Sequence, residues 1–165
     1  MAILVKLYGD LREKVKLQDN VPGIPNTITL EPSRIKVVYD VIKQLNISID
    51  DISHIFVNSN YSGPGKKVTD GDRVGLFPTR MAIMFAEIPK MKSIYVNLHL
   101  ISKSENFVPV KATIDIPDGS TIKSILLECK NFMRENDEKI LVNGKLVYDK
   151  YQPINNGDYI EIIAK

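Results

Sequence analysis

Apolar and polar residues alternate at the start of the chain in the way that predicts a half-buried β-strand. Residues 3 to 8, Ile-Leu-Val-Lys-Leu-Tyr, are rich in aliphatic and β-branched side chains. A polar loop with Pro22, Gly23 and Pro25 follows, and Ile28-Thr-Leu-Glu begins a second apolar segment. We expect the first two strands of a sheet in these two segments.

The spacing of apolar residues then changes to that of a helix. Val38, Val41, Ile42 and Leu45 recur at i, i+3, i+4 and i+7, which places all four on one helix face. Strand patterns return at residues 54 to 58 and 73 to 77, with Asp70-Gly71 suited to a tight turn that needs a positive φ. The order strand, strand, helix, strand, strand predicts a mixed sheet with one helix across it.

The same order recurs in the second half of the chain. Residues 94 to 101 and 112 to 116 alternate as strands, and Ile122, Ile125, Leu126 and Cys129 repeat the helical face. Each of these four lies 84 positions after its counterpart in the first half, as for Ile122 and Val38 (122 − 38). Val57-Asn58 returns as Val142-Asn143, and Gly71-Asp72 as Gly157-Asp158. A fixed period of this kind indicates a duplicated structural unit.

The duplication predicts an α+β protein built from two tandem ubiquitin-like β-grasp domains, each a mixed sheet with one main helix. We expect the first domain at residues 1–86, a linker at 87–92 and the second domain at 93–165.

Composition narrows the class of protein. The chain is 44% hydrophobic and 25% charged, as in globular domains, and its net charge of +2 is too balanced to indicate an anionic partner. Cys129 is the single cysteine, which excludes an intramolecular disulfide. The first residues lack the features of a secretory signal, and no segment reaches the roughly 18 apolar residues of a membrane helix. We therefore expect a cytoplasmic protein with no membrane partner.

Several segments resemble the MoaD/ThiS family of sulfur carriers. In that family a strand ending in Val-Asn-Gly leads to Asp-Gly-Asp-x-Val and Phe-Pro. The matching segments here are Val57-Asn58-Ser59, Asp70-Gly71-Asp72-Arg73-Val74 and Phe77-Pro78, with Val5 to Arg12 near the start. The second copy resembles the family more loosely, through Val142 to Lys145 and Asn156 to Ile160. The resemblance implies the β-grasp fold and contact with an adenylating enzyme.

The chain departs from the family after Phe77-Pro78. The family ends in Gly-Gly, whose terminal carboxylate is adenylated and converted to a thiocarboxylate inside a narrow channel. Here Thr79-Arg80-Met81-Ala82-Ile83 follows, and the second copy closes in Ile162-Ile163-Ala164-Lys165. Side chains at these positions would not enter a channel shaped for two glycines, so we expect the carrier chemistry to be lost.

No pattern of reactive residues indicates an enzyme. His54 and His99 fall in separate domains without ligands at zinc spacing, and Cys129 falls on an inner helix face. Acidic residues such as Asp50 and Asp51 flank helix ends and loops. We therefore expect no catalytic residue, no metal and no cofactor. Lys66, Lys67, Arg73 and Arg80 form a basic group without interleaved aromatic residues, so nucleic acid is not the expected partner.

The predicted partner-binding residues are Phe77, Pro78, Arg80 and Met81. The family uses this end of the sheet to contact its activating enzyme, and interfaces favour Phe, Met and Arg. The alternative is that Met81 to Ile88 packs against the second domain; both can hold at once.

Our leading hypothesis is a non-conjugating MoaD/ThiS-like protein-interaction module. It would be an adaptor in a sulfur-transfer, molybdopterin or related cofactor pathway, and its partner would be an adenylating enzyme or a cofactor-pathway enzyme. Two alternatives stay open: a sulfur carrier for molybdopterin or thiamine biosynthesis, and a small-ligand or RNA-binding β-grasp module.

Overall fold

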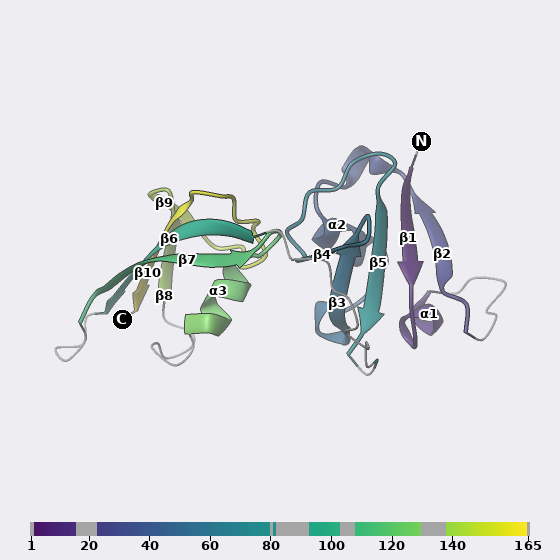
Figure 1. The fold of residues 1–165 in the computed structure, drawn as a ribbon, viewed down its shortest axis with the longest axis horizontal. Coiled ribbons are helices and arrows are strands. Elements are labelled where there is room, and N and C mark those ends of the chain that lie inside the picture. Colours follow the sequence, from purple (N-terminus) through teal and green to yellow (C-terminus); the bar gives the residue numbers. More distant parts are fainter. Residues whose placement is uncertain are drawn as a thin grey trace. The chain divides into compact units, whose positions relative to one another are not determined.

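The computed structural model describes residues 2–15, 23–79, 81, 93–102, 108–129 and 138–164 (Figure 1). The chain divides into two compact units, Met1–Lys92 and Ser93–Lys165. The predicted linker at 87–92 lies outside the described residues, as does Arg80.

The first unit is a five-stranded sheet with a seven-residue helix. The strands are β1 (Ile3–Leu7), β2 (Asn26–Leu30), β3 (Ile52–Val57), β4 (Asn60–Ser62) and β5 (Arg73–Pro78), and the helices are α1 (Leu11–Lys14) and α2 (Val38–Gln44). Short 3-10 helices span Pro32–Arg34 and Ile49–Asp51. The strand order is β2-β1-β5-β3-β4, in which β1 and β5 are parallel and the other neighbours antiparallel.

The second unit repeats this arrangement. Its strands are β6 (Ser93–Ser102), β7 (Val110–Pro117), β8 (Glu138–Val142), β9 (Lys145–Val147) and β10 (Tyr159–Ala164), and its helix is α3 (Ile122–Glu128). The order is β7-β6-β10-β8-β9, again with one parallel pair, β6 and β10. The chain is therefore mixed α+β with two five-stranded mixed sheets, an arrangement consistent with two β-grasp-like domains.

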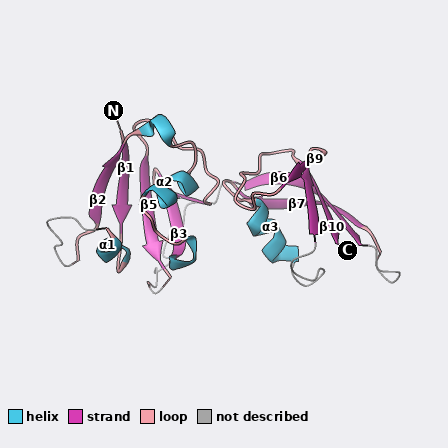
Figure 2. Cartoon of the chain, turned by 180° about the vertical axis from the view of Figure 1, so that it is seen from behind, coloured by secondary structure: helices cyan, strands magenta, loops and turns pink. Residues whose placement is uncertain are grey.

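The alternation of apolar residues in the strands and their helical spacing in α2 and α3 explain where each core lies. Strand β1 buries alternate residues, Ile3, Val5 and Leu7, while α2 buries Val38, Val41 and Ile42 in the same cluster. Figure 2 shows α2 lying across one face of its sheet. Burial of each such side chain contributes roughly 1.5–3 kcal/mol. In the second unit Ile122, Ile125 and Cys129 pack in the same way against β6 and β10.

Candidate functional site

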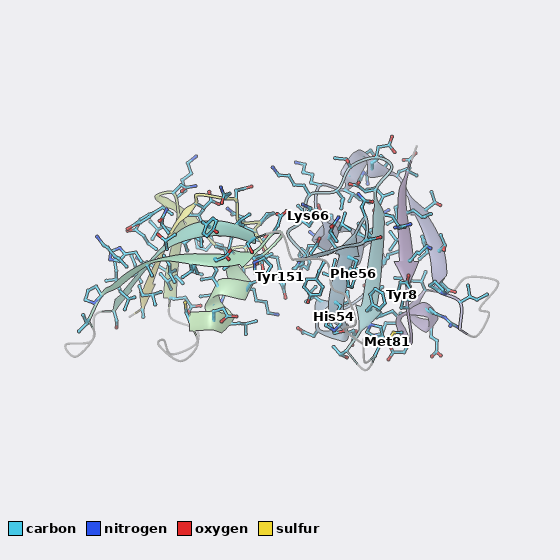
Figure 3. All side chains as sticks on the ribbon, in the orientation of Figure 1. Tyr8, His54, Phe56, Lys66, Met81 and Tyr151 are labelled. Carbon is cyan, nitrogen blue, oxygen red and sulfur yellow. The ribbon has the colours of Figure 1, made fainter. Side chains whose placement is uncertain are left out.

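The face of the first sheet that points away from α2 carries a group of aromatic side chains. Side chains alternate between the two faces of a strand, so the residues between the buried ones lie on this open face. Five of them have rings: Tyr8, just after β1, His54 and Phe56 of β3, Tyr61 of β4 and Phe77 of β5. All five are partly exposed. We call these five residues the aromatic face; Tyr8, His54 and Phe56 are labelled in Figure 3.

The rings of the aromatic face form a continuous series of contacts across the sheet. Tyr8 and Phe77 are stacked, with ring centroids 4.0 Å apart and an interplanar angle of 8°. Phe56 meets Phe77 edge to face at 5.4 Å and Tyr61 at the same distance. Tyr61 in turn contacts the His54 ring at 5.7 Å, and its hydroxyl lies 3.3 Å from His54 Nδ1. Aromatic pairs in such geometries add about 0.5–1.5 kcal/mol beyond their buried area. These contacts therefore stabilise the arrangement of the rings.

Gly75 lies beneath the middle of this series. A Cβ atom placed on Gly75 would lie 3.5 Å from Phe77 Cε2, 3.6 Å from Tyr8 Cε2 and 3.9 Å from Phe56 Cβ. These are ordinary van der Waals distances. The Tyr8 and Phe77 rings therefore lie over the backbone of β5 at Gly75, as aromatic side chains commonly do over a glycine within a sheet.

The charges on the open face are basic. Lys6 of β1 and Arg73 of β5 lie on it by the same alternation, and Arg73 Nη2 donates to Ser59 Oγ at 2.8 Å. At the strand positions that the structure describes, this face carries no carboxylate. A partner that complements it would present apolar and acidic groups.

The predicted partner-binding residues fall into different environments. Phe77 lies in the centre of the aromatic face. Pro78 is buried and packs against the backbone at Gly9, where an added Cβ would lie 2.6 Å from Pro78 Cγ. Met81 is 39% exposed, with its Sδ 3.9 Å from the same position. Phe77 and Met81 thus offer accessible surface, whereas Pro78 shapes the end of the sheet.

The site residues predicted from the sequence did not include Tyr8, His54, Phe56 and Tyr61. The alternation of β1 and β3 contains a usable signal, because Tyr8 and Phe56 have the opposite parity to the buried Leu7 and Val57. Tyr61 has no comparable signal, since the three residues of β4 are too few to show an alternation.

The second sheet shows what the fold itself requires at these positions. Ile101 and Ile163 lie side by side on the parallel strands β6 and β10, as Tyr8 and Phe77 do at the ends of β1 and β5. Ile101 is therefore equivalent to Tyr8, and Ile163 is equivalent to Phe77. In the same way Leu141 and Leu146 take the places of Phe56 and Tyr61. Aliphatic residues therefore suffice at these four positions of the sheet. The second sheet has rings at other positions, where the His99 and Tyr159 centroids lie 6.4 Å apart.

The two histidines considered from the sequence each lie close to a tyrosine of their own sheet. His54 is in β3 and His99 in β6, where His99 Nδ1 lies 3.1 Å from the Tyr159 hydroxyl and 3.5 Å from Glu161 Oε1. Within the described part of the chain, no group of three or more His, Cys, Asp or Glu residues could hold a metal ion. Nor does any helix in that part have the length and hydrophobicity needed to cross a bilayer.

Known proteins resemble this chain in structure. No protein-family model matches the sequence, and no curated protein matches it. Among solved structures, a ubiquitin from Caldiarchaeum subterraneum is similar with a TM-score of 0.32 and 9% sequence identity, covering 43% of this chain and 94% of the ubiquitin. Nothing in these comparisons bears on the MoaD/ThiS resemblance.

Proposed function

We propose that the chain is a non-conjugating protein-interaction module and that the aromatic face holds its partner. The observation that carries this proposal is the connected series of five rings on the open side of the first sheet. Aromatic residues are enriched where proteins bind each other, and a few of them usually supply most of the binding energy. The aliphatic residues at equivalent positions of the second sheet support a role for the rings outside folding.

The partner class follows from charge and from the sequence resemblance. Lys6 and Arg73 favour a segment with acidic groups beside an apolar anchor. The MoaD/ThiS resemblance suggests an adenylating enzyme, or another enzyme of a sulfur-transfer or cofactor pathway, as the protein that supplies this segment. Sulfur transfer by this chain is not part of the proposal, because the segment from Thr79 to Ile83 stands in place of the short family tail that closes in two glycines.

RNA binding is the second candidate, because this face combines aromatic and basic residues. Bases bind to such surfaces by stacking on the faces of aromatic rings. Tyr8 and Phe77 already cover one face of each other, and Phe77 and Tyr61 are both in edge-to-face contact with Phe56. These contacts occupy ring faces on which bases would otherwise stack, so protein binding is favoured.

A sulfur-carrier adenylating enzyme with ATP provides the direct test. Binding would be measured by calorimetry for the wild-type chain, for Phe77→Ala and for the matched control Ile163→Ala in the second sheet. We expect Phe77→Ala to weaken binding by about tenfold or more, since an anchor residue contributes about 2 kcal/mol or more, and Ile163→Ala to bind like the wild type.

Four results would count against the proposal. Mass spectrometry of the same mixture should show an unmodified chain, whereas an adenylate or a thiocarboxylate would reveal a carrier. If both substitutions weakened binding equally, the aromatic face would not be part of the interface. If the wild-type chain did not bind, this class of enzyme would be excluded as the partner. Single-stranded RNA retarded by the wild type but not by Phe77→Ala would favour the second candidate.

A further inference from the structure

Strand β7 forms the outer edge of the second sheet, beside β6 (Figure 1). All eight residues of β7 pair with β6, and no strand that the structure describes pairs with its other side. Exposed edges of this length carry unpaired backbone groups and readily pair with another strand.

The backbone hydrogen bonds show which groups of β7 face outward. Asn97 N–H donates to Asp158, and the Tyr95 carbonyl accepts from Gly157, so the odd residues of β6 point toward β10. The even residues of β6 therefore bond to the even residues of β7, because successive residues point to opposite sides. The N–H and C=O groups of Lys111, Thr113 and Asp115 consequently face the free edge.

Two prolines bound this free edge. Pro109 and Pro117 lie at equal distances before and after Thr113 along the chain. Both are odd-numbered, so their backbone groups face the same side as those of Thr113. Proline has no N–H to donate to a neighbouring strand. Outward pairing is therefore confined to the five residues from Lys111 to Asp115.

We propose that β7 pairs antiparallel with β7 of a second copy of the chain, centred on Thr113. The sequence of the strand is complementary to itself in this register. Lys111 lies opposite Asp115 of the second copy, and Asp115 opposite its Lys111, so two ion pairs form about a two-fold axis. Thr113 faces its own counterpart, a favourable cross-strand pair.

The other face of the strand matches as well. In this register Ala112 lies opposite Ile114 of the second copy, and Val110 opposite its Ile116. Ala112 is exposed and Val110 is 40% exposed although both point to the side of the sheet on which α3 lies. Pairing would remove this apolar surface from water, and each outward-facing pair would exchange two backbone hydrogen bonds.

The corresponding edge of the first sheet does not have these properties. Strand β2 has five residues, and its outward-facing residues are Thr27 and Thr29, which carry no charge. Nothing in β2 sets a register with a second copy. This edge provides an internal control.

The test measures self-association of the full chain by sedimentation equilibrium over a range of concentrations. We expect the wild type to dimerise reversibly, and Lys111→Glu or Asp115→Lys alone to weaken the dimer by about tenfold because like charges then face each other twice. An equimolar mixture of these two variants should restore association, since the carboxylate introduced in one variant then faces the ammonium group introduced in the other.

A backbone substitution provides an independent test. Thr113→Pro removes the central outward N–H and should abolish the dimer, whereas Thr27→Pro at the edge of the first sheet should leave it intact. Circular dichroism would establish that both variants are folded. A wild-type chain that is monomeric at about 0.5 mM, a mixture that fails to associate, or a loss of the dimer in Thr27→Pro alone would overturn the proposal.

Discussion

Asn58 Nδ2 donates a hydrogen bond of 2.7 Å to Asp72 Oδ1, and the same pair recurs in the second domain as Asn143 and Asp158 at 2.9 Å. In each domain the asparagine Oδ1 also accepts from the backbone N–H of the residue after the aspartate. Asn58 and Asn143 have φ values of 51° and 52°, which asparagine tolerates better than most residues. Hydrogen bonds between the Val-Asn and Gly-Asp motifs therefore link the start of the last strand of each domain to the hairpin before it, which is β3-β4 in the first domain and β8-β9 in the second.

Replacement of Asn58 by alanine should destabilise the first domain by about 1–3 kcal/mol. The substitution removes both hydrogen bonds and places alanine at a positive φ. Asn58→Gly separates the two effects, because glycine accepts this φ and should recover part of the loss. Urea denaturation followed by amide NMR signals of each domain would measure this, with Asn143→Ala expected to act on the second domain instead. Equal stability of Asn58→Ala and the wild type would show that these bonds are not needed.

Local periodicity accounts for the elements that could be predicted and for those that could not. The spacing of Val38, Val41 and Ile42 is enough to define a helix face, and the structure buries all three. Strands β4 and β9 have only three residues each, too few for a recognisable alternation. Helix α1, with four residues, is also too short for a recognisable helical period.

The aromatic face illustrates a different limit. Phe77 could be selected from the sequence through the family resemblance. Its stacking partner Tyr8 lies at the other end of the domain sequence and becomes its neighbour only because β1 and β5 pair in parallel. Pairing register between distant strands is a tertiary property, so the individual residues were visible in the sequence but their assembly was not.

Gly9 should tolerate substitution less well than Gly71. It has a φ of 54°, and an added Cβ would lie 2.6 Å from Pro78 Cγ. Gly71 has a φ of 85° but nothing within 4 Å of its Cβ position. Gly71→Ala should cost only the strain of the backbone, about 1 kcal/mol, and Gly9→Ala clearly more. Thermal denaturation of the two variants would compare them, and an equal loss would mean that Pro78 moves aside freely.

Acid should weaken the start of α2 before that of α3. Asp40 accepts from the backbone N–H groups of Lys36 and Val37 at 3.0 and 3.1 Å. Partial burial alone would raise the pKa of Asp40, but these bonds and the ion pair with Lys43 lower it below its ordinary value of 3.8. A lowered pKa means that ionised Asp40 stabilises the folded state at neutral pH and that this contribution is lost as the pH falls below 3.8 toward the folded-state pKa.

The equivalent residue in α3 is Ser124, whose Oγ accepts from Thr121 N–H at 3.2 Å and does not titrate in this range. Asp40→Asn should therefore lower the stability of the first domain near pH 7 by about 1 kcal/mol and make it less sensitive to acid. Urea denaturation at pH 7 and pH 3 would measure both. An acid response that is the same in Asp40→Asn and the wild type would contradict the assignment.

Cys129 should be an unreactive thiol in the folded protein. Its side chain packs in the second core at 5% exposure, at the position that Leu45 takes in the first repeat. Burial, and then the charge of Glu128, raise the pKa of the thiol above its ordinary value, and the thiolate is the form that reacts. We expect iodoacetamide to modify the native chain slowly at pH 8 and rapidly in 6 M urea. Fast alkylation of the native chain, at a rate close to that of the unfolded one, would show that this part of the second core opens readily.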